Sequence, residues 1–304
     1  MRVSTSNEYG PLRSVIVGSV ENFNWPTNDI EFDKGIARST YHETLKDRLP
    51  KSSVLTEAHD DLESLASILQ NKGVEVHRPI ITGPHWSYSA RDVLLTVGNK
   101  VIQCPTPFSS RANEIEMYPF LYEADAEIIK APRPLTDKDP IFDAANVLKL
   151  DDKLLYSLSH SANEAGADWL QQQVGSEFEV IKWQVVEHDI THIDSTLLSL
   201  SKDTVMVNAS RVKEDQLPYF MKHYKKIWIE DIEPITFDHF PYASKWIGMN
   251  LLSIDPTTVI VDTKQVKLAE KLEAHGYEII TATMKQARTL GGGFHCVTCD
   301  LERE

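Results

Sequence analysis

Short apolar runs alternate with polar turns along much of this chain, and the alternation repeats. Four stretches share the order apolar run, polar turn, apolar run: VLLTVGNKVIQC from Val93, VLKLDDKLLYS from Val147, LLSLSKDTVMVNA from Leu197 and LLSIDPTTVIVD from Leu251. Each is typical of a β-hairpin, because turn-forming residues separate two runs of strand length. The four starts are spaced by about fifty residues, a regular period that predicts a repeat architecture.

A second unit, a helical stretch followed by a short β-rich run, recurs between the hairpins. In the clearest copy, at 61–72, the apolar residues between Leu62 and Leu69 form one helical face, Gly73 ends the helix and VEVHRP follows as a strand. Five such units are expected, with helical stretches at 61–72, around Leu121, at 162–174, at 214–224 and at 264–275.

The missing fifth hairpin is predicted to come from the two ends of the sequence. SVIVGS (14–19) and FHCVTC (294–299) are the two remaining strand candidates. Five ββαβ-like units with one unit split between the ends predict an α/β fold closed into a ring, since closure removes exposed sheet edges. A doubly wound sheet also alternates strands and helices. The fixed period of paired hairpins favours the ring.

Carboxylates recur at one position of this repeat. Asp92, Asp143 and Asp194 each lie just before the first strand of a hairpin. Equivalent positions of a ring face the same axis, so the three acids are predicted to converge on a central cavity. His192 lies two residues before Asp194, and on an extended strand both would point the same way. The FHCVTC strand would bring Cys296 to the same place.

These residue types suit the chemistry of a guanidinium group. Clustered carboxylates favour a cation, and a planar guanidinium satisfies two of them with paired hydrogen bonds. A cation beside Cys296 would also favour its thiolate, the nucleophilic form. His192, steered by Asp143, is the candidate acid and base, and the glycines at 291–293 would let the backbone approach the substrate.

Composition narrows the class of protein. Of 304 residues, 41% are hydrophobic, and 31 basic against 45 acidic side chains give a formal charge of −14, which disfavours nucleic acid and anionic membranes as partners. No signal pattern and no apolar run of about 18 residues is present, so a cytoplasmic protein is expected. Three cysteines are too few for a disulfide framework. For Cys299 a buried strand position is favoured over a resolving thiol.

The motifs resemble those of a known family. GGGFHCVTCD (291–300) is very similar to the nucleophile segment of glycine amidinotransferase, and FDAAN, THID and NEYGPLRSVIVG match its other landmarks in the same order. The chain thus resembles the amidinotransferases of the arginine deiminase superfamily, over nearly its whole length. The resemblance implies a five-bladed α/β propeller, or pentein, with pseudo-fivefold symmetry, a single domain at 1–304, and neither a cofactor nor a metal.

The resemblance also implies catalytic roles. Cys296 would be the nucleophile and would carry the amidino group as a covalent thiouronium-type intermediate. His192 of THID would be the general acid and base, and Asp143 of FDAA would be its partner carboxylate.

Substrate contacts are implied in the same way. Asp92 and Asp194 would hold the donor guanidinium, and Arg211 and Ser244 lie where the family binds the carboxylate of the donor.

The acceptor side differs from the glycine enzyme pattern. That pattern has Asn and Met shortly before its histidine, where this chain has Asp189 and Thr191, and its FDAAD motif reads FDAAN here, with Asn146. An acidic Asp189 leads to the hypothesis that the acceptor is a cationic amine, such as a diamine or lysine.

An amidinotransferase is the leading functional interpretation: L-arginine gives its amidino group to Cys296, ornithine leaves, and an amine acceptor takes the group in a ping-pong cycle. The first alternative is an arginine deiminase-like hydrolase that uses water as the acceptor. The second is a non-enzymatic arginine-binding protein, disfavoured because Cys296, His192 and Asp143 are all present. A homodimer is expected for a soluble enzyme of this size.

Overall fold

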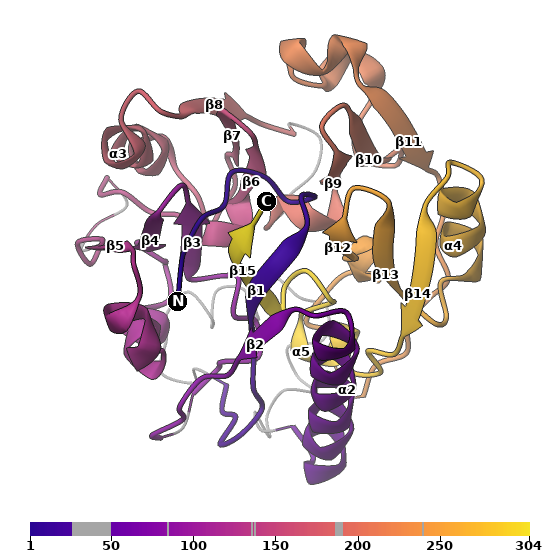
Figure 1. Ribbon diagram of the computed structural model, residues 1–304, viewed down its shortest axis with the longest axis horizontal. Coiled ribbons are helices and arrows are strands. Elements are labelled where there is room, and N and C mark those ends of the chain that lie inside the picture. Colours follow the sequence, from indigo (N-terminus) through magenta and orange to yellow (C-terminus); the bar gives the residue numbers. More distant parts are fainter. Residues whose placement is uncertain (26–49, 84, 135, 137, 186–190, 239) are drawn as a thin grey trace.

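The computed structural model describes residues 1–25, 50–83, 85–134, 136, 138–185, 191–238 and 240–304. Across these ranges the strands form five three-stranded sheets arranged around a common axis (Figure 1). The strand orders are β15-β1-β2, β3-β4-β5, β6-β7-β8, β9-β10-β11 and β12-β13-β14. The first strand in each order lies nearest the axis and the last lies at the rim (Figure 1).

Four of the sheets come from consecutive segments. They consist of β3 (Leu94–Val97), β4 (Lys100–Gln103) and β5 (Glu127–Lys130); β6 (Val147–Leu150), β7 (Lys153–Ser157) and β8 (Glu179–Trp183); β9 (Leu197–Ser201), β10 (Thr204–Asn208) and β11 (Lys225–Ile229); and β12 (Leu252–Asp255), β13 (Thr258–Asp262) and β14 (Glu278–Ala282). In each, the two inner strands pair antiparallel as the predicted hairpin, and the outer strand joins parallel to the middle one.

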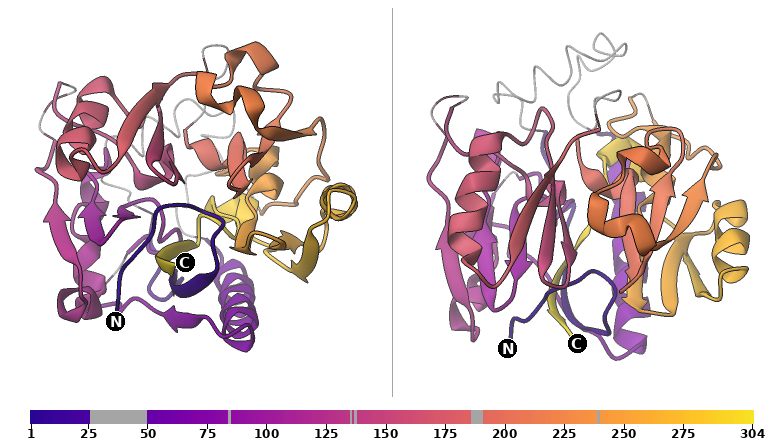
Figure 2. Two further views of the ribbon diagram at one scale, coloured as in Figure 1. Left: turned by 45° about the horizontal axis from the view of Figure 1, so that its top comes forward. Right: turned by 90° about the horizontal axis from the view of Figure 1, so that it is seen from above.

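The fifth sheet joins the two ends of the chain. β1 (Leu12–Val17) pairs antiparallel with β15 (Thr298–Arg303) and parallel with β2 (Glu75–His77). Both chain ends therefore lie on the same face of the ring (Figure 2). The predicted five-bladed propeller with one split unit is confirmed, and the doubly wound alternative does not apply.

Helices cover the rim, but only three of the five predicted helical stretches are α-helices: α2 (Ser52–Asn71), α3 (Glu164–Val174) and α4 (Val266–Glu273). The stretch near Leu121 forms the 3₁₀ turn η4 (Pro119–Glu123), and the stretch at 214–224 forms η7 (Glu214–Gln216) and η8 (Tyr219–His223). Pro119 and Pro218 lie at the starts of η4 and η8, and proline cannot donate the backbone hydrogen bond that a longer helix would need there.

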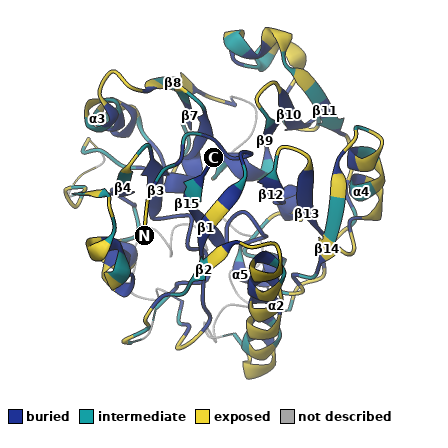
Figure 3. Cartoon of the chain, in the orientation of Figure 1, coloured by how far each residue is buried: buried dark blue, intermediate teal, exposed yellow. Residues whose placement is uncertain are grey.

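The amphipathic pattern of α2 explains its place. Its buried residues recur every three or four positions, and they are Val54, Ala58, Asp61, Leu62, Leu65, Ala66 and Leu69. The helix ends before Gly73, whose φ of +81° lies in the left-handed region. The outer faces of the rim helices are exposed whereas the inner strands are buried (Figure 3). No helix in the described ranges is long and apolar enough to cross a bilayer.

Candidate active site

The predicted site residues occupy matching places in different blades. Asp92 lies two residues before β3, Asp143 four before β6, Asp194 three before β9 and Cys296 two before β15. Each therefore lies at the same end of an inner strand, which is why side chains so distant in sequence come together at the ring axis. All four are buried.

Two local expectations were wrong. Cys296 does not lie on the last strand, because β15 begins only at Thr298; the backbone N–H of Val297 instead donates to the carbonyl of Gly293 at 3.0 Å, which closes a turn. His192 and Asp194 do not share an extended strand either. His192 directly precedes the 3₁₀ turn η6 (Ile193–Ser195), and Asp194 lies within it. This turn places both side chains in the site.

The candidate nucleophile is a buried thiol. Cys296 Sγ donates to Asp194 Oδ2 at 3.2 Å. Burial, together with the negative charges of Asp194 and Asp92, raises the pKa of Cys296 well above its ordinary value. The free protein therefore holds a thiol at neutral pH, and a cation bound among the carboxylates would offset their charge and favour the thiolate.

His192 is held as a cation. Its Nε2 lies 3.1 Å from Asp143 Oδ2, and its Nδ1 lies 3.8 Å from Asp92 Oδ1. Burial alone would lower the pKa of His192, but the hydrogen bond to Asp143 and the charges of Asp92 and Asp143 raise it to about 9. Asp143 is itself oriented, since Thr106 Oγ1 donates to its Oδ1 at 2.7 Å. His192 can therefore serve as a general acid at neutral pH.

One oxygen of Asp92 accepts no hydrogen bond from the described residues, although it faces the charge of His192. Arg111 Nη1 donates to its Oδ2 at 2.6 Å, and Arg111 also pairs with the buried Glu114. The other oxygen, Oδ1, is buried and has no hydrogen-bond partner among the described residues. Burial raises the pKa of Asp92, while the charges of Arg111 and His192 oppose the rise. An unpartnered buried acceptor of this kind suits an N–H group of a substrate.

Asp194 lies between the thiol and a second histidine. Its Oδ2 contacts both Cys296 Sγ and His295 Nδ1, the latter at 3.0 Å. Burial would raise the pKa of Asp194, but the hydrogen bond and charge of His295 and the charge of His192 hold it well below its usual range. Asp194 is therefore a carboxylate throughout the neutral range.

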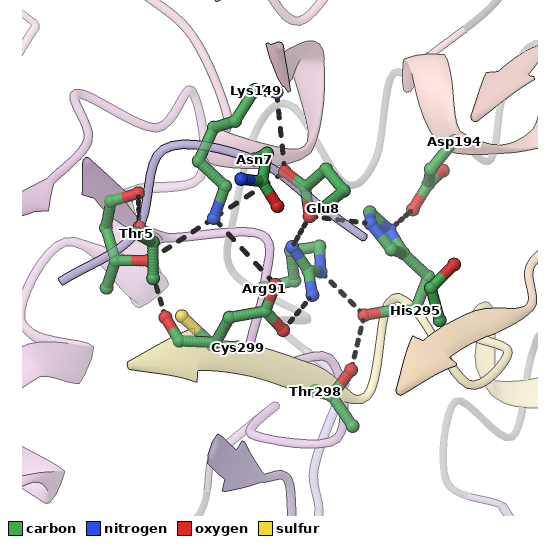
Figure 4. Close-up of polar contacts among 12 residues, drawn as sticks. Thr5, Asn7, Glu8, Arg91, Lys149, Asp194, His295, Thr298 and Cys299 are labelled. Atoms are coloured by element: carbon green, nitrogen blue, oxygen red, sulfur yellow. Dashed lines mark hydrogen bonds and ion pairs between the residues drawn. The ribbon is translucent and has the colours of Figure 1, made fainter. Parts of the chain in front are cut away.

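A buried ionic network contacts His295, the partner of Asp194, and the sequence alone did not predict this network (Figure 4). His295 Nε2 lies 3.4 Å from Glu8 Oε2, and Glu8 pairs with Arg91 at 3.0 Å and with Lys149 at 3.6 Å. Arg91 also pairs with Asp300 at 2.8 Å. Glu8 belongs to the NEYGPLR landmark, but no periodicity in the sequence could have indicated that it lies beside His295.

Arg211 and Ser244 are brought together at the edge of the site. Arg211 Nη2 donates to Ser244 Oγ at 3.2 Å, and its Nη1 donates to Thr196 Oγ1 at 2.8 Å. Burial lowers the pKa of Arg211 to about 10, so the side chain remains charged at neutral pH. Ser244 caps η9 (Lys245–Met249) and is exposed, which leaves this pair open to a ligand carboxylate.

Of the two acceptor-side candidates, Asp189 lies outside the described residues. Thr191 is exposed and adjoins His192, and its Oγ1 lies 3.3 Å from His160 Nε2.

A further residue was missed although the repeat could have identified it. Asn250 lies two residues before β12, at the place that Asp92, Asp143, Asp194 and Cys296 occupy in the other blades. Its Oδ1 accepts from the Cys296 backbone N–H at 2.9 Å, and its Nδ2 is buried with no hydrogen-bond partner in the described part of the chain. An amide carries no charge, so a pattern of carboxylates at this position does not include Asn250.

Cys299 lies in β15 and is buried, and its Sγ donates to the carbonyl of Leu94 at 3.4 Å. Burial raises its pKa to about 11, which makes it a poor nucleophile. This environment agrees with a packing role.

Comparison with known proteins places the chain among enzymes that act on guanidino groups. The profile of the arginine deiminase family matches residues 242–303. The inosamine-phosphate amidinotransferase 1 of Streptomyces griseus is 35% identical over 339 aligned positions, covering 99% of this chain and 97% of the relative. The L-arginine:L-lysine amidinotransferase of Pseudomonas savastanoi pv. phaseolicola is 28% identical, with 99% and 94% covered.

Solved structures of other proteins have the same fold as this chain. The inosamine-phosphate amidinotransferase structure from Streptomyces griseus superposes with a TM-score of 0.90 at 34% identity, covering 99% of this chain and 97% of that one. DDAH from Pseudomonas aeruginosa has the same fold, with a TM-score of 0.66 at 15% identity and coverages of 95% and 99%. With 35% identity across almost the full length of a known relative, the chain belongs to the amidinotransferase family.

Proposed function

We propose that this amidinotransferase takes the amidino group of L-arginine, carries it on Cys296 as a covalent intermediate, and passes it to an amine acceptor after ornithine has left. The supporting observation is one constellation: the Cys296 thiol lies against Asp194 and within the field of Asp92, and Asp92 in turn faces the protonated His192, which is bonded to Asp143. A planar guanidinium can donate to both Asp92 and Asp194 while its central carbon meets the sulfur.

The first half-reaction uses His192 as an acid. Guanidinium binding favours loss of the Cys296 thiol proton to solvent, and the resulting thiolate attacks the amidino carbon to form a C–S bond. The His192 imidazolium gives its proton to the nitrogen of the departing chain as the C–N bond breaks. Ornithine leaves, Cys296 carries the amidino group, and His192 is neutral.

The second half-reaction reverses these roles. The acceptor amine attacks the amidino carbon, and the neutral His192 accepts a proton from the attacking nitrogen. The C–S bond breaks and returns Cys296 as the leaving thiolate. This ping-pong order requires only one histidine, because its two protonation states alternate between the half-reactions.

Separate residues are proposed to select the donor and the acceptor. Arg211 and Ser244 would bind the donor carboxylate, since a charged guanidinium and an exposed hydroxyl lie side by side there. Asp189 and Thr191, which lie three residues and one residue before His192 in the sequence, are proposed as the acceptor-side residues. The relatives named above act on an inosamine phosphate and on lysine, so the acceptor is proposed to be a small molecule with a primary amine.

Intact-protein mass spectrometry tests this function. The protein is mixed with arginine, quenched in acid and weighed, and products are analysed with lysine, glycine or an inosamine phosphate as acceptor. An added mass of one amidino group, lost in Cys296→Ser but kept in Cys299→Ser, with release of ornithine, would support the proposal. Citrulline formed without any amine would assign a hydrolase instead. No adduct and no product would exclude arginine as the donor.

A further inference from the structure

Asn146 is an amide buried completely within the ring. It ends the 3₁₀ turn η5 (Ala144–Asn146), which separates Asp143 from β6. Four hydrogen bonds satisfy its side chain. Its Oδ1 accepts from the Asp143 backbone N–H at 3.1 Å and from Ser161 Oγ at 3.2 Å, and its Nδ2 donates to the Thr191 carbonyl at 2.6 Å and to Ser159 Oγ at 3.1 Å.

The acceptor of its shortest bond is the peptide unit that precedes the candidate acid. The Thr191 carbonyl belongs to the bond between Thr191 and His192. It also accepts from Ser159 Oγ at 3.0 Å. Ser161 Oγ lies 3.1 Å from the same carbonyl, and its one proton can go either there or to Asn146 Oδ1. Donors from two other segments thus hold the peptide from which His192 departs.

The Asn146 side chain therefore hydrogen-bonds to the backbone at Asp143 and to the backbone that precedes His192. Its oxygen holds the N–H of Asp143, and its nitrogen holds the carbonyl that precedes His192. The distance between Asp143 Oδ2 and His192 Nε2, 3.1 Å, depends on where these two backbones lie. Because hydrogen bonds weaken steeply with distance and angle, a small relative shift would separate the pair.

Both ends of the amide are used in this chain, because the oxygen accepts from one backbone and the nitrogen donates to the other. An aspartate, which the glycine enzyme pattern has here, would keep the acceptor toward Asp143 but has no donor for the Thr191 carbonyl. Alanine and serine are too short to bridge the two backbones. Within the described part of the chain, the hydroxyls of Ser159 and Ser161 contact the Thr191 carbonyl, Asn146 and each other, so they hold one side of the pair.

We propose that Asn146 is a positioning residue, which ties the Asp143 turn to the backbone preceding His192 and thereby sets the hydrogen bond on which the acid function of His192 depends. This inference rests on the role of His192 in the proposed function. The charged groups that face His192 are Asp143, Asp92 and Asp194, and of these Asn146 bonds only to the first.

The test compares Asn146→Ala with a matched control, Asn163→Ala. Asn163 also combines an acceptor role, toward the N–H groups of Ile141 and Gly166, with a donor bond to the backbone carbonyl of Asp139. The control therefore loses the same kind of bond in the same blade without touching the backbone at 191–192. Titration of the His192 ring by NMR and the unfolding temperature are measured for both variants.

In Asn146→Ala, which adds no charge, we expect the His192 titration to move down from about 9 toward its ordinary range, because the contact with Asp143 is weakened. With an amine acceptor present, kcat should fall by about 10- to 100-fold while KM for arginine changes less than about threefold, since Asp92 and Asp194 are untouched. Asn163→Ala should lose thermal stability and keep both readouts.

An unchanged His192 titration in folded Asn146→Ala would overturn the proposal and leave a structural role only. A titration shifted downward in a variant that unfolds no earlier than Asn163→Ala would support it most directly. The titration needs no substrate. A wild type that forms no adduct with arginine would therefore refute the proposed donor and still leave the effect of Asn146 on His192 measurable.

Discussion

Replacing Asp143 with asparagine should remove the proton that His192 carries at neutral pH. Thr106 Oγ1 donates to Asp143 Oδ1, and this donor would keep the amide oxygen of the new side chain on its own side. The amide NH₂ would then face His192 Nε2, where it can donate only to a neutral imidazole. The variant therefore both deletes a negative charge and adds a donor that opposes protonation.

The magnitude follows from the pKa of His192. A fall from about 9 to the ordinary value of about 6.5 corresponds to about 3 kcal/mol, and at pH 8 a tenth or less of the molecules would then carry the proton. Burial would lower the pKa of His192 further, whereas the remaining charges of Asp92 and Asp194 would oppose that fall. We expect kcat at pH 8 to fall by about 10²- to 10³-fold.

NMR titration of the ring and the pH profile of kcat/KM are the assays. The raised pKa of His192 means that its stabilising ionic contacts are present below about 6.5 and are lost as the pH rises through about 9. The difference in unfolding free energy between wild type and Asp143→Asn should narrow over the same window. Asp152→Asn, at an exposed turn, is the control. A His192 titration that stays near 9 in Asp143→Asn would refute this account.

Three further perturbations separate binding from folding. Arg211→Ala should raise KM for arginine by about 10- to 100-fold while leaving agmatine, which lacks the carboxylate, unchanged; equal losses for both donors would contradict a carboxylate role. Asp92→Asn should reduce the preference of Cys296 for alkylation by 2-chloroacetamidine over 2-chloroacetamide by about tenfold, because one acceptor for the amidinium is lost; an unchanged ratio would show that the amidino group binds elsewhere. Gly18→Ala should lower the unfolding free energy by about 2–4 kcal/mol in chemical denaturation, since a Cβ there would lie 2.0 Å from the Tyr88 carbonyl; a stability equal to wild type would mean that the two backbones separate freely.

The sequence predicted the strands best where alternating apolar and polar runs coincide with the repeat of about fifty residues. Each hairpin between β3 and β13 was predicted within a residue or two, because the inner strands are buried and apolar and the turns are polar. The rim was less predictable. A stretch with helical periodicity becomes a 3₁₀ turn when a proline shortens it, as at Pro218, and periodicity alone does not register that interruption.

Site prediction succeeded where the repeat constrained it and failed where long-range contacts decide. Asp92, Asp143, Asp194 and Cys296 could be placed near one axis because each lies before an inner strand. The contact between Glu8 and His295 joins residues that are 287 positions apart. No local pattern encodes such a pairing, and only the closure of the ring by β1 and β15 creates it.

The chemistry of the five equivalent positions explains why one of them is an amide. Each of the three carboxylates already has a partner: Asp92 has Arg111, Asp143 has His192, and Asp194 has His295. A guanidinium entering this pocket adds a positive charge that is balanced most simply when the Cys296 thiol loses its proton. A fourth carboxylate in place of Asn250 would offer the cation another counter-charge and so weaken the coupling between donor binding and thiolate formation. The neutral amide of Asn250 accepts a hydrogen bond from the Cys296 backbone without adding a charge. The Cys296 thiolate then supplies the negative charge that balances the bound guanidinium.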